Sequence, residues 1–318
     1  MTKTTVLVGE DVGQANLARM REAYPALEFR FCPLAGQAQD EFVRQAADAE
    51  VMFSKRFPSE ALDRAKRLRW VQAGTAGVER LLDTDLIERG VQLTNANGAH
   101  GVPMAEMILG MMLAFATGLH TLLWAQRARE RVRAQVIEQK FELEGQTLCV
   151  LGLGDIGGTL ARKSQALGMR VLGVRRTKQP FFGLDGQYTP EQLLQALPQA
   201  DHVALCLPLT QETRRIIGER ELRAMRRSAY IYNVGRGPSI HPAALHRALV
   251  EGWIAGAGLD VTDPEPLPED SPLWEMPNVL LGQHSSGSSP LNADRITAIF
   301  MDNLGRYLRG EPLVNVVD

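Results

Sequence analysis

Three residues of complementary chemical type follow three short apolar runs in the C-terminal half of the sequence. Arg236 lies in NVGRG, Glu265 in GLDVTDPEP and His284 in GQHSSG. A fixed arginine can bind a carboxylate, and an imidazolium can give a proton to a carbonyl oxygen as hydride arrives. A carboxylate beside the imidazole favours its protonated form. The three side chains therefore suit reduction of a 2-oxo acid, and neutral His284 would accept the hydroxyl proton in the reverse direction.

A glycine-rich turn stands where a nucleotide cofactor could bind. Gly152, Gly154 and Gly157 form GLGDIG directly after the apolar run LCVL and before a helical pattern that Asp155 and Ile156 begin. In such a unit the first glycine allows a tight turn, the second admits a pyrophosphate, and the third lets helix and strand pack closely. A turn that binds nothing is the alternative. The context predicts a dinucleotide site.

The end of the next strand bears on which dinucleotide binds. NAD sites usually place Asp or Glu about 20 residues after the glycines, on the ribose hydroxyls. Here RVLGV is followed by Arg175, Arg176 and Thr177. Guanidinium groups can bind a ribose 2′-phosphate, which a carboxylate would repel. The sequence therefore predicts NADP as the cofactor, with NAD possible; arginines that are merely solvated are the alternative.

Each candidate also has an ordinary structural interpretation. Arg236 could form a surface ion pair, Glu265 lies in the proline-rich loop PEPLPED, and His284 could be a loop histidine. Asp260, at a strand end, is expected to position the nicotinamide ring or brace the active-site loops rather than transfer protons. The other histidines show no spacing with Cys or carboxylates that suits a metal, so no metal is predicted.

Two series of strand-like apolar runs must position these residues. The first series lies at residues 4–9, 27–32, 50–55 and 70–74. The second lies at residues 147–154, 169–174, 202–209, 229–235, 255–261 and 278–282. Runs that alternate with helical patterns predict α/β architecture with two doubly wound parallel sheets. Loops at the carboxyl ends of such strands meet at the ligand crevice.

Two helical segments connect and complete these series. An apolar then basic helical stretch begins near Val102 and is long enough to cross from one domain to the other. An amphipathic stretch over residues 292–308 is assigned to the first domain. A length of 318 residues also favours two domains over one.

Composition excludes several classes of protein. The formal charge of −2 gives no general attraction to nucleic acid or to an anionic membrane. Cys32, Cys149 and Cys206 lie in or beside apolar runs without metal or CxxC spacing, and we interpret them as reduced core residues. The N-terminus has no signal-peptide hydrophobic region, and no run reaches about 18 apolar residues. A cytoplasmic location is the expectation.

Taken in order, GLGDIG, CLPLT, NVGRG, GLDVTDPEP and PLWEMPNVLLGQH closely resemble the D-isomer-specific 2-hydroxyacid dehydrogenases. WVQAGTAGVERL and NANGAHGVPMAEMILGMMLA resemble the family more loosely. The resemblance implies a Rossmann cofactor domain over residues 100–285. This domain would be inserted in a flavodoxin-like substrate domain made of residues 1–99 and 286–318. The family is usually homodimeric.

The resemblance also implies roles for individual residues. The family's catalytic arginine, glutamate and histidine fall on Arg236, Glu265 and His284. The implied substrate-binding residues include a carboxylate-binding turn and are Lys55, Ala73, Gly74, Thr75, Ala76, Arg236 and His284, with Arg56 nearby. The implied cofactor-binding residues are Gly152, Gly154, Asp155, Ile156, Gly157, Arg175, Arg176, Thr177, Leu207, Pro208, Thr213, Val234, Gly235, Arg236, Asp260, His284 and Gly287.

The sequence departs from the family pattern at Gly282 and Gln283, where Thr-Pro often precedes the histidine. Glu265 argues against the formate dehydrogenase branch, which generally has Gln there. We therefore expect an enzyme that reduces glyoxylate or hydroxypyruvate with NADPH to give the D-2-hydroxy acid. The alternatives are an NAD-dependent D-lactate-type or phosphite-type dehydrogenase and, from another class, a nucleotide-sensing corepressor-like interaction protein.

Overall fold

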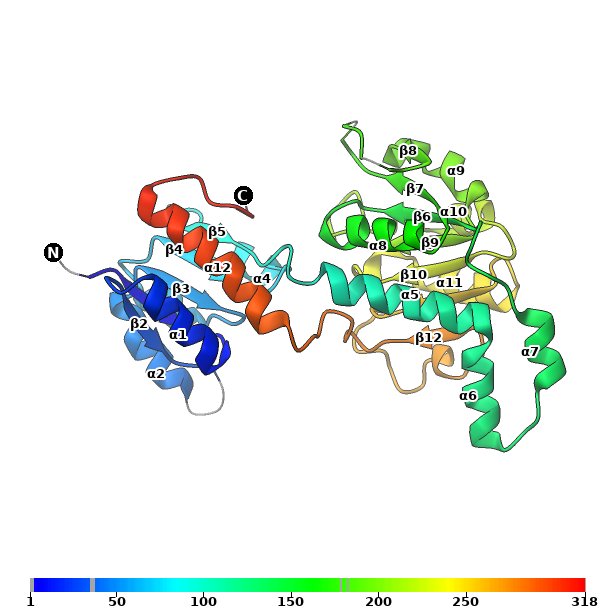
Figure 1. Ribbon diagram of the computed structural model, residues 1–318, viewed down its shortest axis with the longest axis horizontal. Coiled ribbons are helices and arrows are strands. Elements are labelled where there is room, and N and C mark those ends of the chain that lie inside the picture. Colours follow the sequence, from blue (N-terminus) through cyan, green and yellow to red (C-terminus); the bar gives the residue numbers. More distant parts are fainter. Residues whose placement is uncertain (1–2, 35–37, 178, 182, 318) are drawn as a thin grey trace. The chain divides into compact units, whose positions relative to one another are not determined.

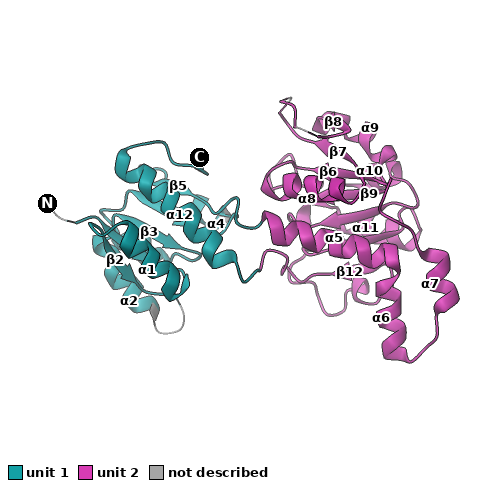
Figure 2. Ribbon diagram, in the orientation of Figure 1, with its two compact units in different colours: residues 1–100, 289–318 teal, residues 101–288 magenta. Residues whose placement is uncertain are grey.

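The computed structural model describes residues 3–34, 38–177, 179–181 and 183–317 (Figure 1). The chain divides into two compact units (Figure 2). Unit 1 comprises residues 1–100 and 289–318, and unit 2 comprises residues 101–288. Unit 2 is thus inserted in the sequence of unit 1.

Unit 1 is built on a parallel sheet of five strands in the order β2-β1-β3-β4-β5. The strands are β1 (Thr5–Val8), β2 (Glu28–Phe31), β3 (Val51–Ser54), β4 (Trp70–Ala73) and β5 (Gln92–Thr94). This order is that of flavodoxin-like sheets, with its switch point between β1 and β3. Side chains alternate between two cores: Leu7 packs in one, and Val6 and Val8 pack in the other.

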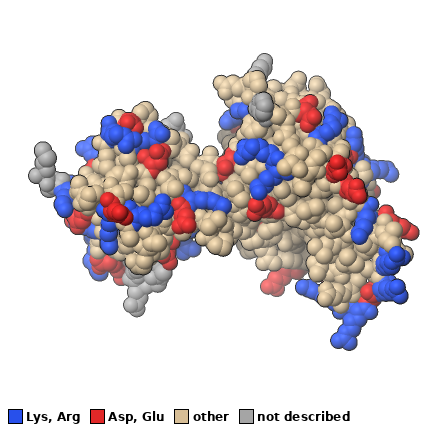
Figure 3. All heavy atoms as spheres, viewed as in Figure 1, with Lys and Arg blue, Asp and Glu red and all other residues tan. Residues whose placement is uncertain are grey.

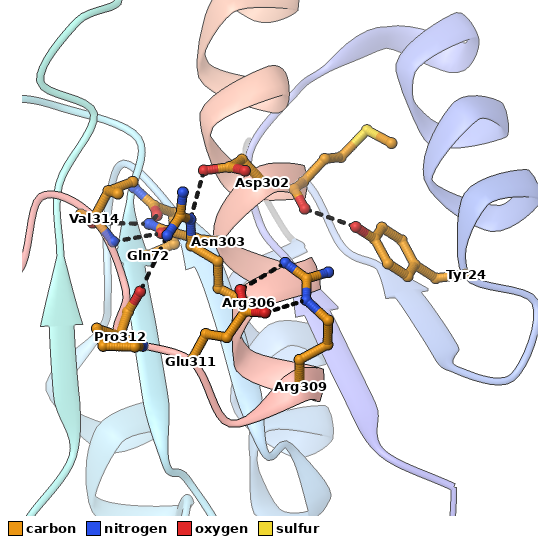
Figure 4. Close-up of polar contacts among 10 residues, drawn as sticks. Tyr24, Gln72, Asp302, Asn303, Arg306, Arg309, Glu311, Pro312 and Val314 are labelled. Carbon is orange, nitrogen blue, oxygen red and sulfur yellow. Dashed lines mark hydrogen bonds and ion pairs between the residues drawn. The ribbon is translucent and has the colours of Figure 1, made fainter.

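Helices cover both faces of this sheet. They are α1 (Gly13–Ala23), α2 (Ala38–Gln45), α3 (Ser59–Arg64), α4 (Glu79–Leu82) and α12 (Asn292–Arg309), with a 3₁₀ helix at Ala46–Asp48. The C-terminal helix α12 is fastened to the sheet by Phe300, whose ring stacks on Phe53 at 4.4 Å and on Trp70 at 5.4 Å. Polar contacts add to this packing (Figure 4), including Asn303 Nδ2 to Gln72 Oε1 at 3.1 Å.

Unit 2 contains a seven-stranded parallel sheet in the order β12-β11-β10-β9-β6-β7-β8. The strands are β6 (Thr147–Leu151), β7 (Arg170–Val174), β8 (Gly186–Tyr188), β9 (His202–Leu205), β10 (Tyr230–Asn233), β11 (Gly256–Leu259) and β12 (Val279–Leu281). Renumbered within the unit, this is the Rossmann order with one further strand beyond its sixth. The predicted fold class, two doubly wound parallel sheets, is confirmed.

The helices of unit 2 are α5 (Gly101–Thr117), α6 (Leu119–Ala128), α7 (Arg133–Gln139), α8 (Asp155–Ala166), α9 (Leu193–Ala196), α10 (Glu219–Ala224) and α11 (Pro242–Val250). Short 3₁₀ helices occupy Pro190–Gln192, Leu197–Gln199, Gly237–Ser239 and Pro272–Trp274. The expected helical stretch from Val102 does not cross between units, because α5 to α7 all belong to unit 2. It also breaks at Gly118, whose φ of +69° ends α5, and α6 continues at 69° to it.

Two strands, β5 and β8, were not predicted from the sequence. β5 and β8 have three residues each, QLT and GQY, and lie at the edges of their sheets. Strands this short carry too few apolar residues for an alternating pattern to be recognised. The predicted runs otherwise fall on the strands but extend past one or both of their ends by one to four residues.

The cysteines are all free thiols, with Cys32 and Cys149 buried and Cys206 partly buried. Burial raises the pKa of the Cys149 thiol to about 12, which keeps it unreactive. This agrees with the expected reduced core residues.

Charged side chains of both signs are interspersed on the face of unit 1 seen in Figure 3. On the same face of unit 2, Lys and Arg predominate around α6 and α7, where the sequence supplies Arg127, Arg129, Arg131 and Arg133. Across the described residues, no one helix has both the length and the apolar character of a membrane span. The bent pair α5 and α6 passes that test only when its two helices are joined.

Candidate active site

The three candidate catalytic residues follow three neighbouring strands of unit 2. Arg236 comes after β10, Glu265 after β11 and His284 after β12, and the strands pair in parallel in that order. Parallel strands end at a common edge of the sheet, so the three loops leave from the same side. This topology brings together residues that are up to 48 positions apart in the chain.

His284 and Glu265 are in direct contact, since Nδ1 of the imidazole is hydrogen-bonded to Oε1 of the carboxylate. Both are accessible, with side chains 55% and 39% exposed respectively. Their contact occupies Nδ1, and Nε2 makes no hydrogen bond to any of the residues that the structure describes. The carboxylate therefore fixes the ring and leaves Nε2 for a substrate oxygen. The peptide bonds on either side, Asp263–Pro264 and Glu265–Pro266, are both cis.

The loop that carries His284 is held by Asp260, at the end of β11. Asp260 as a whole residue is only 2% exposed. It accepts hydrogen bonds from the backbone N–H of Ser285 at 2.9 Å and of Ser286 at 3.2 Å, and from the Ser286 hydroxyl. Its backbone oxygen accepts the His284 N–H at 2.6 Å. The geometry favours the bracing role for Asp260; contact with a nicotinamide stays a prediction.

This support matters because the His284 loop adopts an unfavourable backbone conformation. Gln283 and His284 both have φ of +54°, which costs residues other than glycine roughly 1–2 kcal/mol each. The preceding Gly282 packs so closely on Asp260 that a Cβ would lie 2.5 Å from Oδ1. Gly282 and Gln283 stand where Thr-Pro often precedes the histidine, and the left-handed backbone at Gln283 and His284 is braced by Asp260.

Arg236 is half-buried, in a loop that packs tightly on the loop after β11. A Cβ at the next residue, Gly237, would lie 1.8 Å from the Thr262 carbonyl oxygen, so only glycine fits there. The backbone oxygen of Arg236 accepts hydrogen bonds from Asn233 Nδ2 at 2.9 Å and from Ser239 N at 3.1 Å. Its guanidinium Nη1 donates to the Gly235 oxygen at 2.9 Å. Arg236 shares the sheet edge with the His284–Glu265 pair but does not line the cavity beside that pair.

The glycine-rich turn joins β6 to α8 as the fingerprint requires. Gly152 has φ of +91°, and a Cβ at Gly157 would lie 1.8 Å from the Gly152 oxygen, so both positions demand glycine. Apart from the neighbours of Gly154 in the chain, no heavy atom of the described residues lies within 4 Å of a Cβ built there, so the backbone is open at the N-terminus of α8. Asp155, in the first turn, lies against Gly101. The backbone thus fits a dinucleotide pyrophosphate at this end of the helix.

Other residues expected to bind the cofactor follow β9, β10 and β12 of the same sheet. Leu207, after β9, contacts two predicted positions: a Cβ at Gly152 would lie 2.9 Å from its Cδ2, and one at Gly235 would lie 2.5 Å from its oxygen. Val234 is buried beside them. Thr213 donates to the Pro208 oxygen at 2.6 Å, which closes the loop after β9. Gly287 follows the braced Ser286 turn.

The arginines follow β7 as predicted from the sequence. β7 ends at Val174, Arg175 pairs its N–H with the Tyr188 oxygen at 3.0 Å, and Arg176 and Thr177 are exposed. The pKa of Glu212, in the loop after β9, is lowered first by the hydrogen bond from Thr210 and to a smaller extent by the charge of Arg176. The arginine segment therefore lies near the loop after β9, at the carboxyl edge of the sheet.

The predicted substrate-binding residues of unit 1 follow β3 and β4. Ala73 ends β4, the turn Gly74–Ala76 follows, and Lys55 comes directly after β3. Lys55 Nζ forms an ion pair at 2.7 Å with Glu10, which the sequence analysis missed. Burial raises the pKa of this carboxyl group, while Lys55 acts against the increase. The position of Glu10 after β1, at the switch point, is the signal that could have identified it.

Comparisons with known proteins agree with this architecture. Residues 109–286 match the family model of the D-isomer specific 2-hydroxyacid dehydrogenase NAD-binding domain. A glyoxylate reductase of Korarchaeum cryptofilum is 30% identical over 99% of this chain and 96% of its own length.

Solved structures are similar over the whole chain. A D-isomer specific 2-hydroxyacid dehydrogenase family protein of Aeromonas salmonicida has a TM-score of 0.86 at 31% identity, covering 100% of this chain and 99% of its own. An NADPH-dependent glyoxylate/hydroxypyruvate reductase of Sinorhizobium meliloti, in complex with NADP and sulfate, has a TM-score of 0.82 at 26% identity, covering 99% and 98%. The chain therefore belongs to the D-isomer specific 2-hydroxyacid dehydrogenase family of NAD(P)-dependent oxidoreductases.

Proposed function

We propose that this chain reduces a small 2-oxo acid, of the glyoxylate or hydroxypyruvate type, to the D-2-hydroxy acid, with NADPH as the preferred reductant. The observation that carries the proposal is the His284–Glu265 hydrogen bond at the edge where β10, β11 and β12 end. The glyoxylate reductase of Korarchaeum cryptofilum and the Sinorhizobium enzyme support this substrate type by similarity.

The residues divide the chemistry between them. A reduced nicotinamide, when bound, would supply the hydride that the carbonyl carbon accepts. Protonated His284 donates a proton from Nε2 to the carbonyl oxygen, and Glu265 stabilises the imidazolium through Nδ1. Arg236 binds the substrate carboxylate. In unit 1, Lys55 and the backbone N–H groups of the turn Gly74–Ala76 are groups suited to binding an anion. Asp260 keeps the His284 loop in its left-handed conformation.

The preference for NADPH rests on the residues after β7. Arg175 and Arg176 stand where NAD-specific proteins carry an acid, and guanidinium groups favour a 2′-phosphate. The NADP bound to the Sinorhizobium protein supports the same choice by similarity.

A single panel tests the proposal. Initial rates with glyoxylate, hydroxypyruvate and pyruvate are followed by the absorbance of NADPH or NADH. We expect the wild-type protein to have a higher kcat/KM with NADPH than with NADH. The double variant Arg175→Ala, Arg176→Ala should bring the two kcat/KM values closer together. The control Arg64→Ala replaces an exposed arginine on α3, in unit 1. No oxidation of either cofactor by any acid would refute the function, and a clear preference for NADH would refute the cofactor assignment.

We also propose that the active protein is a homodimer in the cytoplasm. Leu122, Leu123 and Trp124 on α6 are 42%, 52% and 54% exposed, which is unusual for large apolar side chains so close together. A second copy of the chain would cover them. Light scattering should give twice the mass of one chain, and Leu123→Glu should shift the mass toward the monomer; a wild-type monomer would refute the dimer.

A further inference from the structure

Three loops of unit 1 leave the carboxyl edge of its sheet and bring two opposite charges together. Glu10 follows β1, Lys55 follows β3 and Gly74 follows β4, and these three strands are neighbours in the sheet. Glu10 is 5% exposed, and its Oε1 pairs with Lys55 Nζ at 2.7 Å. The Lys55 side chain, in contrast, is 49% exposed. One member of the pair is therefore buried, while the other is open to an anion.

Both charged side chains pack directly on the turn that follows β4. A Cβ at Gly74 would lie 2.9 Å from Glu10 Oε2 and 3.1 Å from Lys55 Cγ, so glycine leaves the space that they occupy. The carbonyl oxygens of this turn accept hydrogen bonds from the loop after β5. The N–H groups of Thr75 and Ala76 donate to no group that the structure describes. The turn therefore offers donors to an anion beside an ion pair whose charges cancel.

The loop that carries the buried carboxylate is held in place by its neighbours. Gly9 donates its N–H to the Phe53 oxygen at 2.8 Å, and a Cβ at Gly9 would lie 2.5 Å from the Phe42 ring. The residue before Glu10 is thus fastened to β3 and packed against α2. Burial raises the pKa of Glu10, and the ammonium group and backbone N–H of Lys55 act against this increase. Lys55 therefore favours the charged form of the carboxylate, which in turn offsets the charge of Lys55.

We propose that Glu10 is a specificity-determining residue: by neutralising Lys55, it suits the anion-binding groups of unit 1 to a single carboxylate and disfavours a second negative charge. The inference rests on the proposed function and deepens it, since glyoxylate and hydroxypyruvate each carry one negative charge. A second carboxylate on the substrate would meet the field of buried Glu10, while the ammonium group that could bind it is already paired. Repulsion between unit charges about 6 Å apart in a partly hydrated site lowers affinity roughly tenfold.

The test compares kcat/KM with NADPH for hydroxypyruvate, which carries one negative charge, and for oxaloacetate, which has a similar length and carries two. The wild-type protein should prefer hydroxypyruvate by about tenfold or more. Glu10→Gln keeps the shape of the side chain but leaves the charge of Lys55 unopposed. The preference should therefore shrink by about tenfold, mainly through a lower KM for oxaloacetate. The double variant Glu10→Gln, Lys55→Met removes both charges and should restore the preference for hydroxypyruvate.

Glu22→Gln is the matched control, because Glu22 is exposed in the last turn of α1, outside these loops, and the ratio between substrates should not change. A misfolded variant loses activity toward both acids alike, so the ratio distinguishes specificity from loss of fold. If Glu10→Gln keeps the wild-type ratio, or the double variant does not restore the preference, the inference is wrong while the proposed function stands. If neither acid is reduced, the inference fails, and the panel of 2-oxo acids described above decides separately whether the proposed function stands.

Discussion

Replacement of Gly154 by alanine should separate cofactor binding from folding in the glycine-rich turn. Gly154 has φ of −78°, and a Cβ there would meet no heavy atom within 4 Å in the described part of the structure, its chain neighbours aside. Alanine is therefore compatible with the fold. The same position faces the open N-terminus of α8, where a pyrophosphate must approach the backbone closely, so the added methyl group should obstruct the cofactor and nothing else.

The size of the effect follows from the contacts that the methyl group would displace. Loss of one hydrogen bond between a backbone N–H and a charged phosphate costs roughly 1.5–3 kcal/mol. The dissociation constant for NADPH should therefore rise by about 10- to 150-fold. The melting temperature should change little, because no contact within the protein is lost.

Fluorescence titration with NADPH, together with thermal unfolding of the same samples, provides the assay. Gly110→Ala on α5 is the control, since its Cβ also meets nothing within 4 Å and alanine should stabilise the helix by about 0.5–1 kcal/mol without affecting binding. Gly157→Ala should lower both stability and affinity, because its Cβ would lie 1.8 Å from the Gly152 oxygen. An unchanged dissociation constant for Gly154→Ala would refute this placement of the pyrophosphate.

Two further predictions concern the brace and the core. Ser286→Ala removes the hydroxyl that bonds to Asp260, so kcat should fall by about tenfold with a smaller change in KM; a lower melting temperature with unchanged kcat would make Ser286 purely structural. Burial lowers the pKa of His202 from 6.5 to about 4. Between these two pKa values His202 is protonated in the unfolded chain but neutral in the folded protein. The free energy of unfolding should therefore fall as the pH drops from about 6.5 toward 4, by up to roughly 3 kcal/mol. Urea titrations at pH 7, 5.5 and 4.5 should show this fall in the free energy of unfolding, and the fall should be smaller for His202→Gln. The same dependence on pH in the variant and the wild type would contradict the prediction.

The positions of Arg236, Glu265 and His284 could be predicted because each follows a short strand that is rich in apolar residues. Such runs are recognisable without a partner strand, and parallel topology then places their ends at one edge. The bend at Gly118 could not be predicted, because a glycine within an apolar pattern is compatible with a continuous helix. The close packing of Gly118 on Val136 is a contact between residues 18 positions apart, and it is visible only in the folded structure: a Cβ at Gly118 would lie 2.9 Å from Val136 Cγ1.

The contacts that support the site also could not be predicted from the sequence. The Ser286 hydroxyl acts on Asp260, which is 26 positions away, and the SSG segment resembles any polar turn. Glu10 was overlooked for a different reason: it follows β1 as His284 follows β12, but no motif accompanied it. Its burial and its pairing with Lys55 became visible only in three dimensions.

The central claim is that His284 transfers the proton, and steady-state turnover by His284→Asn tests it most directly. Asparagine tolerates the left-handed φ of +54° at this position, so the loop should keep its shape. We predict that kcat for 2-oxo acid reduction falls by about two to four orders of magnitude while the dissociation constant for NADPH stays nearly constant. A variant that retains the wild-type kcat would contradict the account.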